Sequence, residues 1–271
     1  MALPARHQFS ITYLDRLDIE NKRQGLREPS GLALCGDGQA LWVVSDDTRR
    51  IFQIDLRGHI QPKASFAIDA SGLEGITLDA SGRHLLAVAE DGNTFLKAEI
   101  EARTIVQTAQ LAAMAGYEPI APYFASGPAN KGLEGVAWND SSQTLFALKE
   151  GQPGLLIEVT ADLQTIVSHR LLDADQGFVD SELDPEAIDF SDLCYDRLRD
   201  CLWIISDKAR RLFLYDWRGG RVLQSCRLAY GDQGDYREIN KAEGLAISAQ
   251  GDRLYVVSDK EARLYIFDLR S

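Results

Sequence analysis

Long apolar segments are missing from this sequence. No uninterrupted apolar run approaches 18 residues, so no membrane-spanning helix is predicted. The first ten residues, MALPARHQFS, also lack the apolar core of a secretory signal. For the sequence as it stands we expect a cytoplasmic protein, or a periplasmic one if a leader or anchor has been removed.

Several catalytic and metal-binding motifs are also missing. There is no G-x-S-x-G nucleophile elbow, which disfavours a conventional serine hydrolase, and no Walker or Rossmann fingerprint. The four cysteines show neither C-x-x-C zinc spacing nor the density of a disulfide framework. Cys194 and Cys201 flank a predicted hairpin, where they are either two reduced strand cysteines, which we favour, or a disulfide across the two strands.

Positive charge is scarce. The chain has 29 Lys and Arg against 41 Asp and Glu, a net charge of −12. This disfavours nucleic acid and anionic membranes as partners, because both need a basic surface. It favours a cation if the acids are gathered in one place, whereas acids scattered over the surface would only aid solubility. A hydrophobic content of 45% and a charged content of 26% are typical of a folded globular protein.

One unit is repeated five times along the chain. The copies begin at Pro29, Leu73, Leu133, Pro185 and Ala242. Each contains short apolar runs rich in β-branched and aromatic residues, such as 41–44, 202–205 and 254–257, separated by Gly, Asp, Asn and Ser turns. Four-stranded units repeating every 40 to 60 residues are typical of a β-propeller.

The chain ends support this interpretation. The fifth unit stops after three strands, and the segment 8–15 alternates apolar and polar residues before the first unit begins. We therefore predict an all-β fold, a single domain over residues 1–271, as a five-bladed propeller closed by the N-terminal strand in the last blade. A sixth, irregular blade within 104–131 is the alternative.

Acids recur at two positions of the unit. Glutamate begins the predicted inner strand in four units, at Glu74, Glu134, Glu186 and Glu243, and Ser30 replaces it in the first. An acid ends the second strand in all five, at Asp46, Glu90, Glu150, Asp207 and Asp259. In a propeller both positions lie on one rim of the central channel, so we expect these nine carboxylates to converge there. The glycine that follows most of the glutamates would let the inner strands crowd together near the axis.

Nine carboxylates so close together raise one another's pKa, and their negative charge must be compensated. A hard cation with six to eight oxygen ligands, Ca²⁺, would compensate it. Zinc or copper is not expected, because none of the four histidines occupies a repeated position. The alternative is that the acids cap strand ends and pair with nearby lysines, which are Lys131, Lys149, Lys208, Lys241 and Lys260.

The longer connections between units should lie on the same face. They are 116–131, 173–184 and 230–241, and their aromatic residues either shield the rim or contact a ligand. These aromatic residues are Tyr117, Tyr123, Phe124, Phe178, Tyr230 and Tyr236.

The repeated motif, Glu-Gly-(Leu/Ile/Val), a Gly/Asp turn and Leu-(Tyr/Trp)-Val-(Val/Ile)-Ser-Asp, resembles the SdiA-regulated, calcium-regulated β-propeller family. It is also similar to the wider phytase-like (esterase-like activity of phytase) propellers, from about Ile11 to the end. The resemblance implies Ca²⁺ held by the residues matching the nine acids above. Members of the family are usually exported or membrane-anchored and are associated with calcium homeostasis or stress.

Phytase-like propellers hydrolyse phosphomonoesters with several calcium ions and with Lys and Arg residues. This sequence has counterparts of those basic residues. The counterparts are Lys149, Lys208, Lys260, Arg49 and Arg210. No catalytic residue is assigned. The function predicted is a calcium-binding propeller acting as a sensor or binding platform; the alternatives are a calcium-dependent phosphoesterase, esterase or lactonase, and a metal-free protein scaffold. The candidate partners are a metal ion, a small phosphorylated or ester substrate and a protein.

Overall fold

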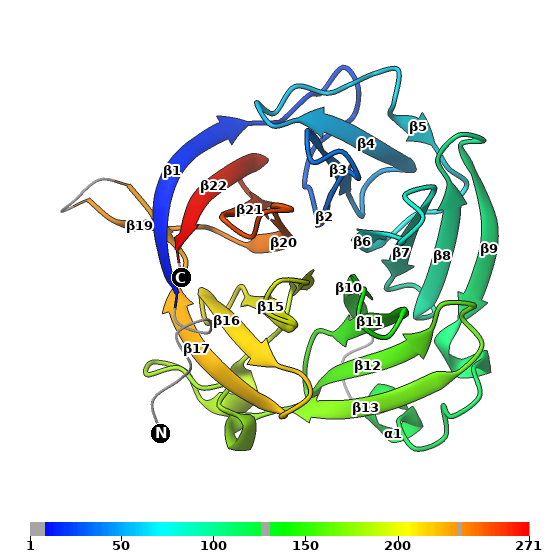
Figure 1. The fold of residues 1–271 in the computed structure, drawn as a ribbon, viewed down its shortest axis with the longest axis vertical. Coiled ribbons are helices and arrows are strands. Elements are labelled where there is room, and N and C mark those ends of the chain that lie inside the picture. Colours follow the sequence, from blue (N-terminus) through cyan, green and yellow to red (C-terminus); the bar gives the residue numbers. More distant parts are fainter. Residues whose placement is uncertain (1–8, 126–130, 232–234, 271) are drawn as a thin grey trace.

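The computed structural model describes residues 9–125, 131–231 and 235–270. Five four-stranded antiparallel sheets stand around a central axis as the blades of a propeller (Figure 1), which confirms the predicted fold. Blades one and two comprise β2 (Gly31–Leu34), β3 (Ala40–Val44), β4 (Arg50–Asp55) and β5 (Phe66–Ala67), then β6 (Leu73–Leu78), β7 (His84–Ala89), β8 (Thr94–Glu99) and β9 (Thr104–Gln110).

The other three blades follow in chain order. Blades three and four comprise β10 (Leu133–Asn139), β11 (Thr144–Lys149), β12 (Gly154–Thr160) and β13 (Ile166–Leu172), then β14 (Asp192–Asp196), β15 (Cys201–Ser206), β16 (Arg211–Asp216) and β17 (Arg221–Arg227). Blade five comprises β20 (Ala242–Ile247), β21 (Arg253–Ser258), β22 (Arg263–Arg270) and β1 (Ser10–Asp18). A small hairpin of β18 (Ala229–Tyr230) and β19 (Arg237–Glu238) precedes it.

The region considered for a sixth blade belongs elsewhere. Residues 104–110 form β9, the outer strand of blade two, and the chain continues through the 3₁₀ turn Leu111–Ala113 to the short helix α1 (Ala121–Ala125). Residues 126–130 of that region lie outside the described residues.

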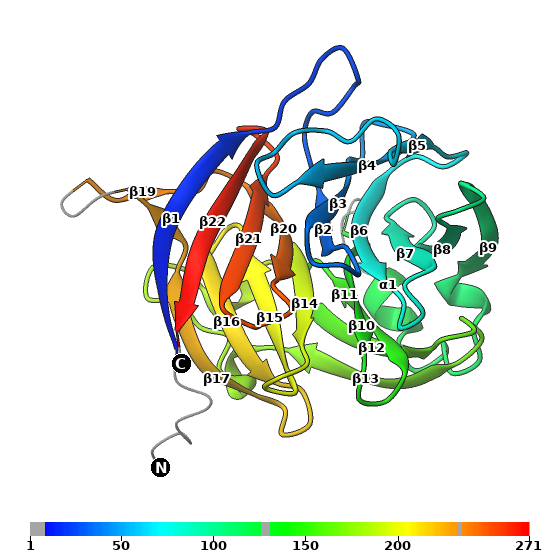
Figure 2. The ribbon, with the colours of Figure 1, turned by 45° about the horizontal axis from the view of Figure 1, so that its top comes forward.

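The N-terminal strand closes the ring as predicted. β1 pairs antiparallel with β22, from Ser10 opposite Arg270 to Asp18 opposite Arg263, and the two lie side by side in Figure 2. The backbone of Phe9 is also fixed to blade four, because Gln224 accepts from its N–H at 3.1 Å and donates to its carbonyl at 2.7 Å. The closed ring leaves β22 without a free edge for pairing with other chains.

The core consists of five apolar clusters, each between two adjacent blades. β3 illustrates the cause: Leu41 and Val43 pack against blade five, whereas Trp42 and Val44 pack against blade two. Both faces of such a strand are buried, which is why it reads as a continuous apolar run rather than as an alternating pattern.

The cysteines belong to this strand framework. All four are free thiols, and Cys194 pairs across the sheet with Trp203 rather than with Cys201, which lies opposite Asp196. The favoured interpretation of two reduced strand cysteines is confirmed.

Glycine lets the inner strands approach closely, as predicted. A Cβ on Gly75 would lie 2.7 Å from the carbonyl oxygen of Glu134, and one on Gly31 would lie 2.2 Å from that of Glu74. Real Cβ atoms do not reach such distances, so glycine is required where the backbones of neighbouring blades meet near the axis.

Candidate functional site

One rim of the channel is built from the starts of inner strands and the ends of second strands. The segment entering β6 is bonded to the end of blade one, because Gly72 donates to the carbonyl of Asp46 at 3.2 Å. Within blades three and five, the end of the second strand is bonded to the start of the inner strand, because the backbone N–H of Glu150 donates to the carbonyl of Gly132 and that of Asp259 to the carbonyl of Lys241, both at 3.1 Å. These bonds bring the two repeated acidic positions onto the same rim.

Three glutamates occupy the centre of this rim. Glu74, Glu134 and Glu243 are the second residue of β6, β10 and β20, respectively. Burial, followed by the charges of Asp46 and Glu243, raises the pKa of Glu74 to about 8. Burial, followed by the charges of Glu74 and Glu243, raises the pKa of Glu134 well above its usual range. Burial raises the pKa of Glu243 to about 7, although Lys241 opposes the shift.

The acids that end the second strands surround these glutamates. The side chain of Glu90 accepts from the N–H of Gly132 at 3.2 Å, and burial raises its pKa. Burial likewise raises the pKa of Asp46 and of Asp207. We call this group the acidic mouth; its members are Glu74, Glu134, Glu243, Asp46, Glu90, Glu150, Asp207 and Asp259.

Two lysines enter the acidic mouth. Lys131 binds Glu150 at 2.6 Å, and Lys241 binds Asp259 and, at 3.2 Å, Glu243. The predicted pairing of acids with lysines is therefore present for these three carboxylates. In contrast, the side chains of Glu74 and Glu134 make no hydrogen bond or ion pair with any residue that the structure describes.

Glu186 is not part of the acidic mouth, which corrects its predicted position. It lies in the 3₁₀ turn Pro185–Ala187, before blade four begins, and lines a separate cavity with Asp173, Asp175 and Asp184. Ser191 takes the glutamate position instead. The sequence holds the necessary signal, because 16 residues separate the two acidic positions in units two, three and five, and counting back 16 from Asp207 gives Ser191.

The same shift places Asp192 where the other blades have glycine. Asp192 lies opposite Ile205, just as Gly244 lies opposite Val257. Its side chain is 1% exposed; Oδ2 accepts from the N–H of Leu245 at 2.7 Å, while Oδ1 has no partner in the described structure. Burial raises the pKa of Asp192 well above its usual range, and the charge of nearby Glu243 adds to this effect.

Sequence reasoning also missed Asp189, a buried acid just before blade four. It accepts from Ser206 Oγ at 2.9 Å and from the N–H of Lys208 at 3.0 Å, and its charge reaches Asp207. No repeat signal marks it, because the corresponding residue of blade five is Lys241. Asp189 therefore adds negative charge beside the acidic mouth.

The sequence profile of the SdiA-regulated family matches residues 16–268. The chain belongs to the SdiA-regulated family. It is also similar in structure to the PQQ-bound form of an aldose sugar dehydrogenase from Streptomyces coelicolor, with a TM-score of 0.52 and 16% identity over 99% of this chain and 100% of that chain. At that identity the likeness shows a shared propeller fold. No helix among the described residues of this SdiA-regulated protein has the length and apolarity needed to cross a membrane.

Most of the remaining candidates have structural roles in this SdiA-regulated protein. Phe178 is buried and packs against Phe190 and Phe213 at centroid distances of 5.1 Å. Lys149 is 2% exposed, and its Nζ donates to the carbonyls of Gly151 at 2.5 Å and Pro153 at 3.3 Å. Neither side chain is free to contact a ligand.

The other loop aromatics differ in exposure. Tyr117 and Phe124 contact each other at 6.2 Å, Tyr123 packs against the same core cluster, and Tyr230 stacks on Tyr265 at 5.0 Å. Tyr236, by contrast, is 68% exposed. The first four side chains therefore pack against other residues of the fold.

The donors of the acidic mouth suit a hard cation. Every candidate ligand is a carboxylate oxygen, the eight carboxylates are accompanied by two ion-paired lysines, and the charge of Glu243 acts on Asp192, whose Oδ1 has no partner in the described structure. As the side chains stand, no three His, Cys, Asp or Glu residues in the described ranges are grouped so that they could hold a metal ion. Coordination would therefore require glutamate side chains to rotate toward one another.

Proposed function

We propose that this protein is a calcium-binding propeller, in which the acidic mouth holds the cation and the ring serves as a sensor or binding platform. The observation that carries this proposal is the pair Glu74 and Glu134. Each is largely buried, the pKa of each is raised by burial and by the charges of neighbouring acids, and neither has a hydrogen-bond or ion-pair partner among the described residues. Carboxylates left in this state are stabilised by a divalent cation.

Calcium fits this donor set better than magnesium or zinc. Ca²⁺ accepts six to eight oxygen ligands in flexible geometry, whereas Mg²⁺ demands a compact octahedron and Zn²⁺ prefers nitrogen and sulfur. The residues that would hold it are Glu74 and Glu134, followed by Glu243 and Asp192. Glutamate side chains on separate blades can adjust to a large ion, which is consistent with the finding that the described residues hold no preformed cluster.

The environments of three of the five basic residues named above favour binding over phosphoester hydrolysis. A phytase-like reaction needs cationic side chains free to hold phosphate. Here Arg49 lies 3.4 Å from Asp69, Arg210 pairs with Glu238, and the Lys149 ammonium is directed at backbone carbonyls. We therefore propose a non-catalytic role, and a screen of the calcium-loaded protein on phosphomonoesters, esters and lactones should show no turnover.

Titration calorimetry with Ca²⁺ at pH 8 tests the proposal. Wild-type protein should bind, and Glu74→Gln/Glu134→Gln should lose at least about 100-fold in affinity, because two charged ligands are removed. Glu186→Gln is the matched control, since this glutamate lies in the turn Pro185–Ala187 rather than in an inner strand, and it should bind as wild type does. Equal affinity in the double variant and the wild type would refute the proposed site.

A further inference from the structure

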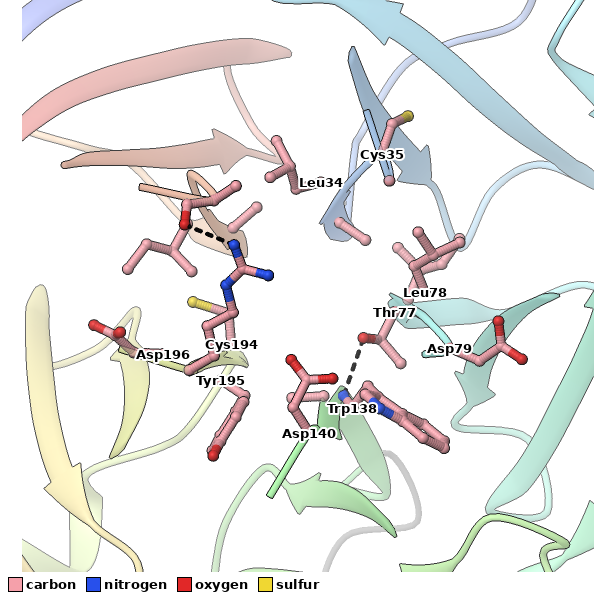
Figure 3. Close-up of a pocket in the computed structure, with 18 of the residues that line it drawn as sticks. Leu34, Cys35, Thr77, Leu78, Asp79, Trp138, Asp140, Cys194, Tyr195 and Asp196 are labelled. Atoms are coloured by element: carbon pink, nitrogen blue, oxygen red, sulfur yellow. Dashed lines mark hydrogen bonds between the residues drawn. The ribbon is translucent and has the colours of Figure 1, made fainter. Parts of the chain in front are cut away.

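The opposite mouth of the channel holds a cavity of about 550 Å³. All five inner strands line it, starting beyond the glycine positions at Leu32, Ile76, Val136, Leu193 and Leu245 and continuing into the turns that follow these strands (Figure 3). No member of the acidic mouth lines this cavity. Its size falls in the range of small-molecule sites, and its floor is apolar.

Two of the four charged side chains that line the cavity are already bonded to neighbouring side chains. Asp79 accepts from Ser81 Oγ at 2.8 Å and lies 2.9 Å from His84 Nδ1. Asp196 is 1% exposed and binds Arg199 at 2.7 Å and the indole N–H of Trp203 at 3.0 Å. These two acids serve to hold the turns in place and are not available to a ligand.

The other two charged side chains make no ion pair with any residue that the structure describes. Asp140 is exposed, its carboxylate points into the opening in Figure 3, and it has no hydrogen-bond or ion-pair partner in the part of the chain that the structure describes. Arg197 donates one N–H to the carbonyl of Ala249 at 3.1 Å, which anchors its guanidinium across the boundary between blades four and five. Arg197 makes no ion pair with a described residue, and it does not pair with Asp140.

The surroundings of Asp140 suit an ammonium group. The side chains of Trp138 and Tyr195 line the same cavity and flank Asp140 in Figure 3. The exposed carboxylate of Asp140 attracts an organic cation by its charge. The planar guanidinium of Arg197 is in turn suited to a carboxylate, which it can bind with two parallel hydrogen bonds.

We propose that this cavity binds a small zwitterion of the amino-acid or betaine class. Its ammonium lies at Asp140, its carboxylate lies at Arg197, and its apolar part rests on the floor formed by the inner strands. A cation alone would leave Arg197 unpaired, and an anion alone would leave Asp140 unpaired. Only a ligand with both charges satisfies both side chains.

Four probes separate the contributions of the two charges. L-leucine and glycine betaine carry both charges, choline carries only the cation, and butyrate carries only the anion. Calorimetry should show binding of at least one zwitterion. Choline and butyrate should each bind with an affinity at least about tenfold lower than that zwitterion. Asp140→Asn and Arg197→Gln should each weaken zwitterion binding by about tenfold or more. Asp69→Asn and Arg57→Gln change exposed residues outside the cavity. They are the matched controls and should leave zwitterion binding unchanged.

A second readout locates the ligand. The indole N–H resonance of Trp138 should shift during the titration, whereas that of Trp42, buried between blades one and two, should not. The proposal is overturned if neither zwitterion binds at about 10 mM, which corresponds to less than about 3 kcal/mol. It is also overturned if choline or butyrate binds as tightly as the zwitterions, or if both cavity variants bind like the wild type.

Discussion

Asp192 Oδ2 accepts a 2.7 Å hydrogen bond from the backbone N–H of Leu245, so that a side chain joins the inner strands of blades four and five. Elsewhere around the ring a glycine lets the two backbones meet directly. Gly75, for example, packs against the backbone of Gly135 and Val136. The carboxylate of Asp192 thus replaces a backbone contact and leaves its second oxygen, Oδ1, beside Gly135 without a partner.

Replacing Asp192 separates its structural role from its proposed cation-binding role. Asp192→Ala would leave the buried Leu245 N–H unpaired and should lower the free energy of unfolding by about 1–3 kcal/mol. Asp192→Asn keeps an acceptor for that N–H, so its stability at pH 8 should stay close to wild type while its calcium affinity falls. Denaturant titrations and calorimetry measure the two effects. A fully stable alanine variant would show that the hydrogen bond contributes nothing.

Gly75 should not tolerate a methyl group. In Gly75→Ala the new Cβ would lie 2.7 Å from the carbonyl of Glu134 and from Cα of Gly135, so blades two and three must separate. We expect a loss of about 1–3 kcal/mol in unfolding free energy, or more, from overpacking. Gly36→Ala is the control, because its Cβ would meet only Leu78 at 3.5 Å. Equal urea midpoints for the two variants would contradict the proposed crowding near the axis.

Stability without divalent cations should depend on pH through the raised pKa values of Glu74, about 8, and Glu243, about 7. Unfolding returns these groups to their usual pKa near 4.5, so the folded state holds more protons between these values. The stabilisation is full below pH 4.5 and is lost as the pH rises toward 8. In EDTA, the pH 5 to pH 8 decrease in unfolding free energy should be smaller for Glu74→Gln than for wild type.

The exposed Glu101→Gln variant is the control for this pH series and should follow the wild-type curve. Calcium should restore more stability at pH 8 than at pH 5, because protons compete with the cation for the same oxygens. If Glu74→Gln and wild type in EDTA showed the same dependence of unfolding free energy on pH, this would contradict the inferred protonation of the acidic mouth.

Deleting residues 1–18 should open the ring. β22 would lose its pairing with β1, and Gln224 would lose both bonds to Phe9, so an unpaired edge strand would be exposed. We expect aggregation or a much lower melting temperature, and partial rescue by a synthetic peptide of residues 9–18 added in trans. Melting curves and light scattering report on both. A truncated protein that stays monomeric and as stable as the full chain would contradict closure by β1.

The repeats predicted the fold because each blade buries the same apolar pattern, and the unmatched chain ends identified the closing strand. They failed at blade four, where Glu186 stands two residues before an apolar residue, as Glu243 does, but lies in a connecting turn. Loop lengths differ between blades, so matching the local motif gave a wrong register that a fixed 16-residue spacing corrects. The environments of Asp140 and Arg197 were not predictable, because pairing of the nearby acids depends on side-chain directions in turns that do not repeat.

The most direct test is the position of the cation itself. Crystals grown with Ca²⁺, or soaked with a lanthanide in its place, would show the ion by anomalous scattering. We predict a peak at the acidic mouth, with Glu74 and Glu134 as ligands and Glu243 or Asp192 beside them. A peak only in the cavity beside Glu186, or no peak at a saturating calcium concentration, would contradict a calcium site in the channel.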